Sequence, residues 1–85
     1  MTSLPDITSA VHEIMRSVLE RDVDPAVDVF DQGATSLAFI RAVARISEKY
    51  GITVDVSELE EASVDSLAEL VARQIDTTAT ATAGV

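Results

Sequence analysis

The stretch FDQGATSLAFIRAVARISEKYG, residues 30–51, combines the end of a loop, a run with helical periodicity and a glycine that stops the run. At about 100° per residue, the apolar side chains of the run gather on one face. That face consists of Phe39, Ala42, Val43, Ile46 and Tyr50. Gly51 is the residue type that most often ends a helix. The sequence therefore predicts a helix from about Ser36 to Tyr50, with Leu37 projecting about 150° from the centre of its core face.

Ser36 stands at the start of this helix, where serine is common because its oxygen accepts a hydrogen bond from an unpaired backbone N–H. Thr35 can fill that capping position instead, which would leave the hydroxyl of Ser36 free. Gly33 and Ala34 are small and keep the approach to the hydroxyl open. Leu37 is large, apolar and off the core face, which favours a surface that another molecule buries. Ser36 is therefore the candidate functional residue, and plain helix capping is the alternative interpretation.

Two other segments have helical periodicity. The first runs from about Asp6 to Arg21, with start signals at Ser3 and Pro5. The second runs from about residue 64 to residue 75, and Ser63 is its expected N-cap. Both have one apolar face and one charged face, as expected for helices that pack on a common core.

The connections differ in length. Residues 22–35 form a loop that is long for a small bundle. The apolar side chains that we expect to dock this loop are Val27, Val29 and Phe30. Residues 52–56 form a short connector, and residues 57–61 suggest one helical turn capped by Ser57.

The predicted fold class is all-α, a small three- to four-helix bundle with a long loop between the first two helices. We expect residues 1–76 to form a single domain and residues 77–85, TTATATAGV, to be a disordered tail. The net charge of −9 disfavours nucleic acid as a partner. No apolar run reaches the roughly 18–20 residues of a membrane span, and the N-terminus lacks an export signal. We therefore expect a cytoplasmic monomer without a membrane partner.

The ionisable residues form no metal or catalytic site that the sequence identifies. The chain has no cysteine and one histidine, His12, so we expect no metal site. The aspartates of the long loop do not fit the spacing of a calcium-binding loop. Basic residues recur along the middle helix at Arg41, Arg45 and Lys49. This basic stripe is either a solvated face or a contact for an acidic partner surface.

At these residues the chain resembles the acyl and peptidyl carrier proteins. The hallmark of that family is an acidic bundle of three or four helices whose long first loop ends in a Gly-x-x-Ser-Leu type motif. Here the motif begins at Gly33 and ends at Ser36 and Leu37, and the resemblance extends over roughly residues 6–76. It implies that Ser36 carries covalent 4'-phosphopantetheine, transferred from coenzyme A by a phosphopantetheinyl transferase. The thiol of that arm then holds acyl or aminoacyl intermediates as thioesters, and the protein itself catalyses nothing.

The resemblance also implies a surface that partner enzymes grip. Its expected residues are Leu37, Ile40, Arg41, Arg45 and Leu59. The chain departs from fatty-acid carriers in having Thr35 before the serine and basic residues on the second helix. These departures favour a stand-alone carrier of a nonribosomal peptide or polyketide type pathway, loaded by an adenylating enzyme or an acyltransferase and used by downstream enzymes. The alternative is a helical protein-interaction module without a covalent cofactor.

Overall fold

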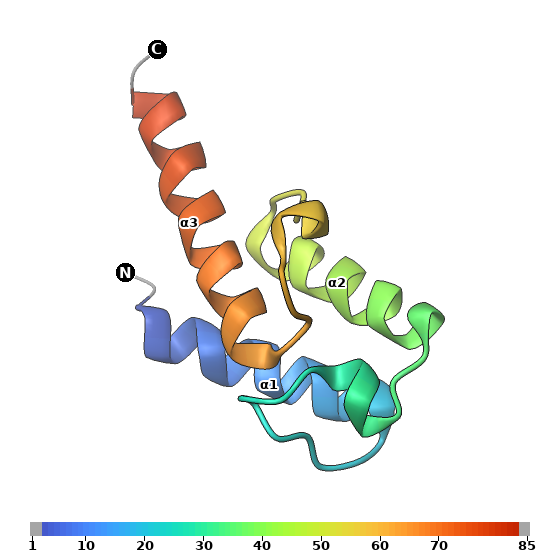
Figure 1. Ribbon diagram of the computed structural model, residues 1–85. Coiled ribbons are helices and arrows are strands. Elements are labelled where there is room, and N and C mark those ends of the chain that lie inside the picture. Colours follow the sequence, from blue (N-terminus) through green and yellow to red (C-terminus); the bar gives the residue numbers. More distant parts are fainter. Residues whose placement is uncertain (1–2, 84–85) are drawn as a thin grey trace.

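The computed structural model describes the backbone of residues 3–83 and the side chains of residues 3–75. It contains three α-helices, α1 (Leu4–Leu19), α2 (Ser36–Tyr50) and α3 (Val64–Ala83), shown in Figure 1. Two short 3-10 helices, η1 (Val29–Gln32) and η2 (Val56–Glu58), lie in the connections. The part of the chain that the structure describes has no strand, and the predicted all-α bundle is confirmed.

Helix α1 begins and ends on the local signals present in its sequence. The hydroxyl of Ser3 accepts a hydrogen bond from the backbone N–H of Asp6 at 3.4 Å, and a proline occupies the first turn. At the other end Glu20 adopts the left-handed conformation, with φ of 56°, and its N–H donates to the carbonyl of Arg16. The helix therefore begins and ends about two residues before the predicted positions.

One hydrophobic core joins the three helices. Helix α1 packs against both α2 and α3, so it is the partner that the other two share. The largest fully buried apolar side chains are Met15, Ile46, Leu67, Leu70, Val11, Val29, Val64 and Val71. Each helix contributes to this set through the apolar face that its periodicity predicts.

Helix α2 has the predicted bounds. Gly51 ends it in the left-handed conformation, with φ of 64°, and donates its N–H to the carbonyl of Ser47. Phe39 and Ile46 are buried, whereas Leu37 on the opposite side is 60% exposed.

Helix α3 is longer than predicted. Its expected end near Ile75 is wrong, because the backbone stays helical to Ala83. Residues 76–83 contain neither glycine nor proline, and alanine has the highest helix propensity. Of the tail expected to be disordered, residues 77–83 are therefore helical backbone, and the last two positions lie outside the described residues. Figure 1 shows these last turns of α3 extending beyond α1 and α2.

The two connections differ from the predictions in detail. Val29 is buried as expected, whereas Val27, which precedes η1, and Phe30 are exposed. Within η1, successive side chains point to different sides, which separates Phe30 from Val29. The Phe30 ring instead lies against the ring of Phe39, with 5.3 Å between centroids. The predicted cap of η2 is also wrong: the carboxylate of Asp55, rather than Ser57, accepts the capping bond.

Candidate functional site

The hydroxyl of Ser36 is released from capping by its neighbour. Thr35 Oγ1 accepts a hydrogen bond from the backbone N–H of Ala38 at 3.1 Å and so caps α2. Ser36 is the first residue of the helix, it is exposed, and its hydroxyl makes no hydrogen bond with the described residues. The prediction that Thr35 caps the helix and leaves Ser36 free is confirmed.

The start of α2 suits a phosphate ester on Ser36. The first backbone N–H groups of a helix lack helical partners and form the positive end of the helix dipole. The first turn of α2 contains no acidic residue that would oppose a phosphate there. A phosphodiester attached to the Ser36 oxygen would therefore sit in a favourable field, and the residues present fit the group.

The approach to Ser36 is a short turn after η1. Gly33 follows η1 in the left-handed region, with φ of 96°, and its N–H donates to the carbonyl of Phe30 at 3.2 Å. The next residue, Ala34, donates its N–H to the carbonyl of Val29 at 3.0 Å. The two bonds tie the turn back onto η1 immediately before α2 begins.

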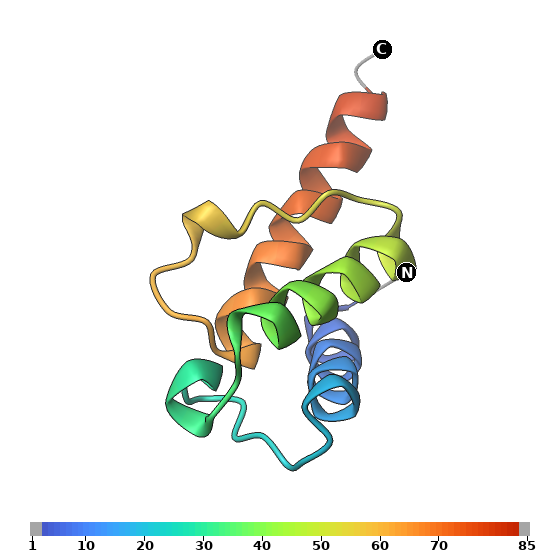
Figure 2. The same cartoon turned by 90° about the vertical axis from the view of Figure 1, so that its right-hand side faces the viewer.

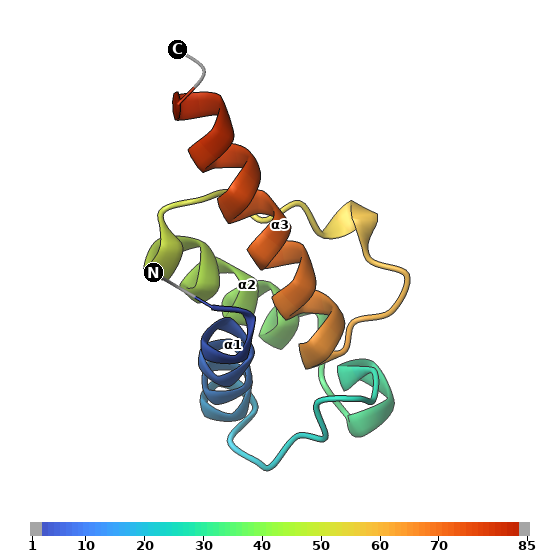
Figure 3. The same ribbon diagram turned by 90° about the vertical axis from the view of Figure 1, so that its left-hand side faces the viewer.

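Two contacts fix how α2 is oriented. Arg45 Nη1 lies 3.4 Å from the hydroxyl of Ser17, so the basic flank of α2 faces α1. The hydroxyl of Ser47 accepts a bond from the N–H of Val54 at 3.3 Å, so the opposite flank faces the connection that carries η2. In Figures 2 and 3, α1 and η2 lie on opposite sides of the bundle. By helical geometry Ser36 and Ile40 lie on the η2 flank, and Leu37 points outward between the flanks.

The predicted partner residues lie on the solvent-facing side of α2 and in the hollow beside it. Leu37 and Ile40 are 60% and 62% exposed, and Arg41 and Arg45 are exposed beside them. Leu59 is half-buried and lines a hollow of about 230 Å³ between η1, α2 and η2. The other residues that line it are Asp28, Phe30, Phe39, Val56, Glu60, Glu61 and Ala62. The structure therefore places four of the predicted residues along α2 and the fifth in the neighbouring hollow.

Sequence reasoning missed the residues that order the long loop. Asp28 Oδ1 accepts from the N–H of Phe30 at 2.8 Å, and Asp28 Oδ2 accepts from the N–H of Ala62 at 2.9 Å. The second bond joins the loop to the segment just before α3. A carboxylate directly before a turn is a usual signal for a local cap, but its second, distant partner leaves no signal in the sequence.

A second Ser-Leu pair competes with Ser36 as an attachment site. Asp65, Ser66 and Leu67 lie in the first turn of α3, so a second serine followed by leucine stands at a helix start. Leu67, however, is 0% exposed, and the N–H of Ser66 donates to the hydroxyl of Ser63 at 3.1 Å. The structure therefore distinguishes an exposed Ser-Leu pair at α2 from one whose leucine belongs to the core.

His12 and Asp55 make structural contacts away from Ser36. His12 Nε2 lies 2.7 Å from the carbonyl oxygen of Val23, a contact that joins α1 to the start of the long loop. The pKa of Asp55 is lowered by hydrogen bonds from the hydroxyl and then the backbone N–H of Ser57. Among the described residues, no three acidic or histidine side chains are grouped to hold a metal ion. No helix in that part of the chain is long and apolar enough to span a membrane.

Comparison with protein families matches residues 9–71 to the phosphopantetheine attachment site family. The match covers more than half of the chain, and the chain belongs to this family of carrier domains. Members carry covalently attached 4'-phosphopantetheine, and a carrier domain tethers substrates rather than catalysing their conversion. Such domains interact with phosphopantetheinyl transferases and with biosynthetic enzymes. Comparisons with curated proteins and with solved structures gave no significant match.

Proposed function

We propose that Ser36 is the residue to which the 4'-phosphopantetheine arm is attached. The observation that carries this proposal is the pairing of an exposed, uncommitted hydroxyl at Ser36 with the cap at Thr35. The matched segment holds two Ser-Leu pairs, and the exposed Leu37 favours the first, since a transferase must surround the serine that it modifies.

In the proposed reaction the Ser36 oxygen attacks the phosphorus of coenzyme A that bears the pantetheine. The new bond is a phosphodiester to Ser36, the serine proton leaves to the transferase or solvent, and adenosine bisphosphate is the leaving group. The chain's own contribution is to present the hydroxyl and to place helix dipole charge beside the new phosphate. The thiol at the far end of the arm then forms thioesters with acyl or aminoacyl groups.

The proposed partner surface is the exposed side of α2 with the hollow beside it. Leu37 and Ile40 supply an apolar centre, and the basic stripe of Arg41, Arg45 and Lys49 flanks it. Within the described residues the recorded ion pairs involve Arg16 and its neighbours, and none involves this stripe. Unpaired basic side chains beside an apolar contact favour a partner surface with acidic residues.

We further propose a stand-alone, monomeric carrier in the cytoplasm, serving a pathway of the nonribosomal peptide or polyketide type. Thr35 and the basic stripe are the features that separate the chain from the fatty-acid carrier pattern. An adenylating enzyme or an acyltransferase would load the arm, and downstream enzymes would use the cargo.

The attachment proposal is tested by intact mass measurement after incubation with coenzyme A and a broad-specificity phosphopantetheinyl transferase. We expect the wild-type chain to gain the mass of one arm and Ser36→Ala to gain nothing. Ser66→Ala is the matched control, because it removes the serine of the second pair, and it should be modified like the wild type. Modification of Ser36→Ala would place the arm on another residue and overturn the proposal. No modification of the wild type by several transferases would also overturn it, and would leave the helical interaction module.

The proposed role of the basic stripe has its own test. Arg41→Glu combined with Arg45→Glu should slow loading by the cognate loading enzyme, and more so at low salt, because surface charges steer encounter. Arg16→Glu combined with Arg73→Glu changes the net charge equally on other parts of the surface. Equal loading rates for the two double variants would reduce the stripe to a solvated face.

A further inference from the structure

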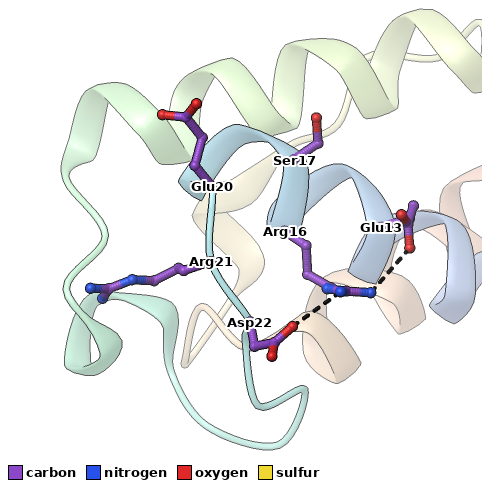
Figure 4. A pocket seen from close by; sticks show the side chains of 6 residues that line it. All are labelled: Glu13, Arg16, Ser17, Glu20, Arg21 and Asp22. Atoms are coloured by element: carbon purple, nitrogen blue, oxygen red, sulfur yellow. Dashed lines mark hydrogen bonds and ion pairs between the residues drawn. The ribbon is translucent and has the colours of Figure 1, made fainter.

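Arg16 and Arg21 lie at the same end of α1 but bind different parts of the molecule. Both line a polar hollow of about 370 Å³, drawn in Figure 4. Arg16 bonds to the carboxylates of Glu13 and Asp22, at 3.5 and 3.0 Å. Figure 4 shows Arg21 extending away from this group, toward the loop that precedes α2.

The guanidinium of Arg21 lies against the turn that leads to Ser36. Its Nη1 donates a hydrogen bond to the backbone carbonyl of Gln32. It also fills the space beside Gly33: a Cβ placed on this glycine would lie 2.8 Å from Nη1. The glycine suits the positive φ of 96°, and the absence of a side chain leaves room for the guanidinium in its present position.

The side chain of Gln32, the partner of Arg21, holds the long loop together by hydrogen bonds to its backbone. Its Oε1 accepts from the N–H of Asp24 at 2.7 Å. Its Nε2 donates to the carbonyls of Asp24 and Val27, at 3.1 and 2.9 Å. The bond from Arg21, two residues after the end of α1, to the backbone of Gln32 therefore ties the start of the long loop to a segment that is already held by three side-chain bonds.

We propose that Arg21 is a positioning residue for the transfer of the arm onto Ser36, a role that rests on the attachment proposal above. The residue that it holds is separated from Ser36 only by Gly33, Ala34 and Thr35. We call the turn closed when the bonds described above hold it against η1, and open when they are broken. Loss of the Arg21 bond increases the fraction of molecules whose turn is open. A transferase that needs the closed turn then binds more weakly. The expected signature is a higher KM for the carrier with an unchanged kcat, because saturation with carrier restores the closed form.

The kinetic test compares Arg21→Ala with Arg16→Ala, using coenzyme A and the same broad-specificity transferase. Both variants lose one positive charge from the same hollow, but only the first loses the bond to Gln32. Arg21→Ala should raise the KM by about two- to fivefold, the size expected for one lost hydrogen bond, and Arg16→Ala should leave it unchanged. Arg21→Lys keeps a donor and should restore most of the loss.

A second measurement tests the positioning without the transferase. Amide hydrogen exchange at Gly33 and Ala34, whose N–H groups bond within the turn, should be up to about fivefold faster in Arg21→Ala and unchanged in Arg16→Ala. Gly33→Ala should raise the KM more in the wild-type background than in Arg21→Ala, because only the former holds the guanidinium where the new Cβ lies.

The outcomes separate the two proposals. A wild type that accepts the arm, with Arg21→Ala equal to Arg16→Ala in KM and in exchange, would overturn the positioning role alone. A wild type that no transferase modifies would overturn the attachment proposal and the role in transfer with it, and the exchange rates would then report only whether Arg21 orders the turn.

Discussion

Ser36 and Ser66 both stand in the first turn of a helix, and each is followed by a leucine. Leu37 is exposed on the outer side of α2, whereas Leu67 is completely buried between the helices. The two dipeptides are identical, so the difference comes from the helix faces on which they lie. A Ser-Leu pair indicates a docking site only where the core does not already use the leucine.

The caps of these helices differ in the same way. Thr35 caps α2 at an exposed position, and Ser63 caps α3 while only 1% exposed. When a buried capping hydroxyl is removed, water replaces it less readily at the N–H that it capped, so the cost of disturbing the two caps should differ.

The comparison of the two leucines predicts the largest effect, and that effect is on the free energy of unfolding. Leu67→Ala should lower the free energy of unfolding by about 2–5 kcal/mol, because it leaves a cavity in the core. Leu37→Ala is the matched change, and it should stay within about 0.5 kcal/mol because the side chain is already in water. Urea unfolding of both variants measures the difference, and equal losses would show that the two leucines are not distinguished by burial.

A smaller effect is expected at the caps. Thr35→Ala should cost about 1 kcal/mol, the usual value of an N-cap, and Ser63→Ala about 1–2 kcal/mol, since the hydroxyl that it removes is buried. Ser36→Ala should cost less than either, as its hydroxyl caps nothing. Thermal unfolding monitored by circular dichroism gives the order, and a loss at Ser36 as large as that at Thr35 would contradict the assignment of the cap.

The start of η2 offers a third comparison, in which the cap is a charged group. Hydrogen bonds from Ser57 lower the pKa of Asp55 in the folded protein, so its carboxylate form favours folding. This contribution is present above the ordinary aspartate pKa and is lost as the pH falls through the lowered value. Asp55→Ala should therefore be less stable than the wild type near neutral pH, with the gap closing in strong acid. An NMR titration with the Asp55 midpoint at its ordinary value of 3.8 would remove the basis for this prediction.

The smallest effect concerns the far end of α3. We propose residues 1–76 as the folding unit, because the buried residues of the described core lie between Ile7 and Val71. Deleting residues 77–85 should change the free energy of unfolding by less than about 0.5 kcal/mol and should leave arm transfer unchanged. A large loss of stability would show that the last turns of α3 belong to the core.

Local signals predicted most of the fold. The bounds of α2 follow from Thr35, Gly51 and the apolar period between them, and these act within a few residues of one another. The exposed Leu37 and the free Ser36 could be predicted for the same reason. The length of α3 could not, because a run of threonine and alanine suits a helix or a tail equally well.

The contacts that order the long loop were not predictable from local patterns. Asp28 reaches Ala62 across 34 positions of the chain, and Arg21 reaches Gln32 across 11. Both depend on how the helices bring distant segments together. The acidic residues of the loop therefore look like a solvated surface in the sequence, whereas in the structure Asp28 fastens the loop.

The threonine at position 35 has a consequence for the working life of the protein. Because it already performs the task that helix starts commonly assign to serine, esterifying its neighbour takes nothing from the scaffold. The unloaded, armed and cargo-bearing forms should then share one fold. Enzymes that attach, load or unload the arm would then bind the same folded domain in every form. They would have to distinguish the forms by the group attached to the serine.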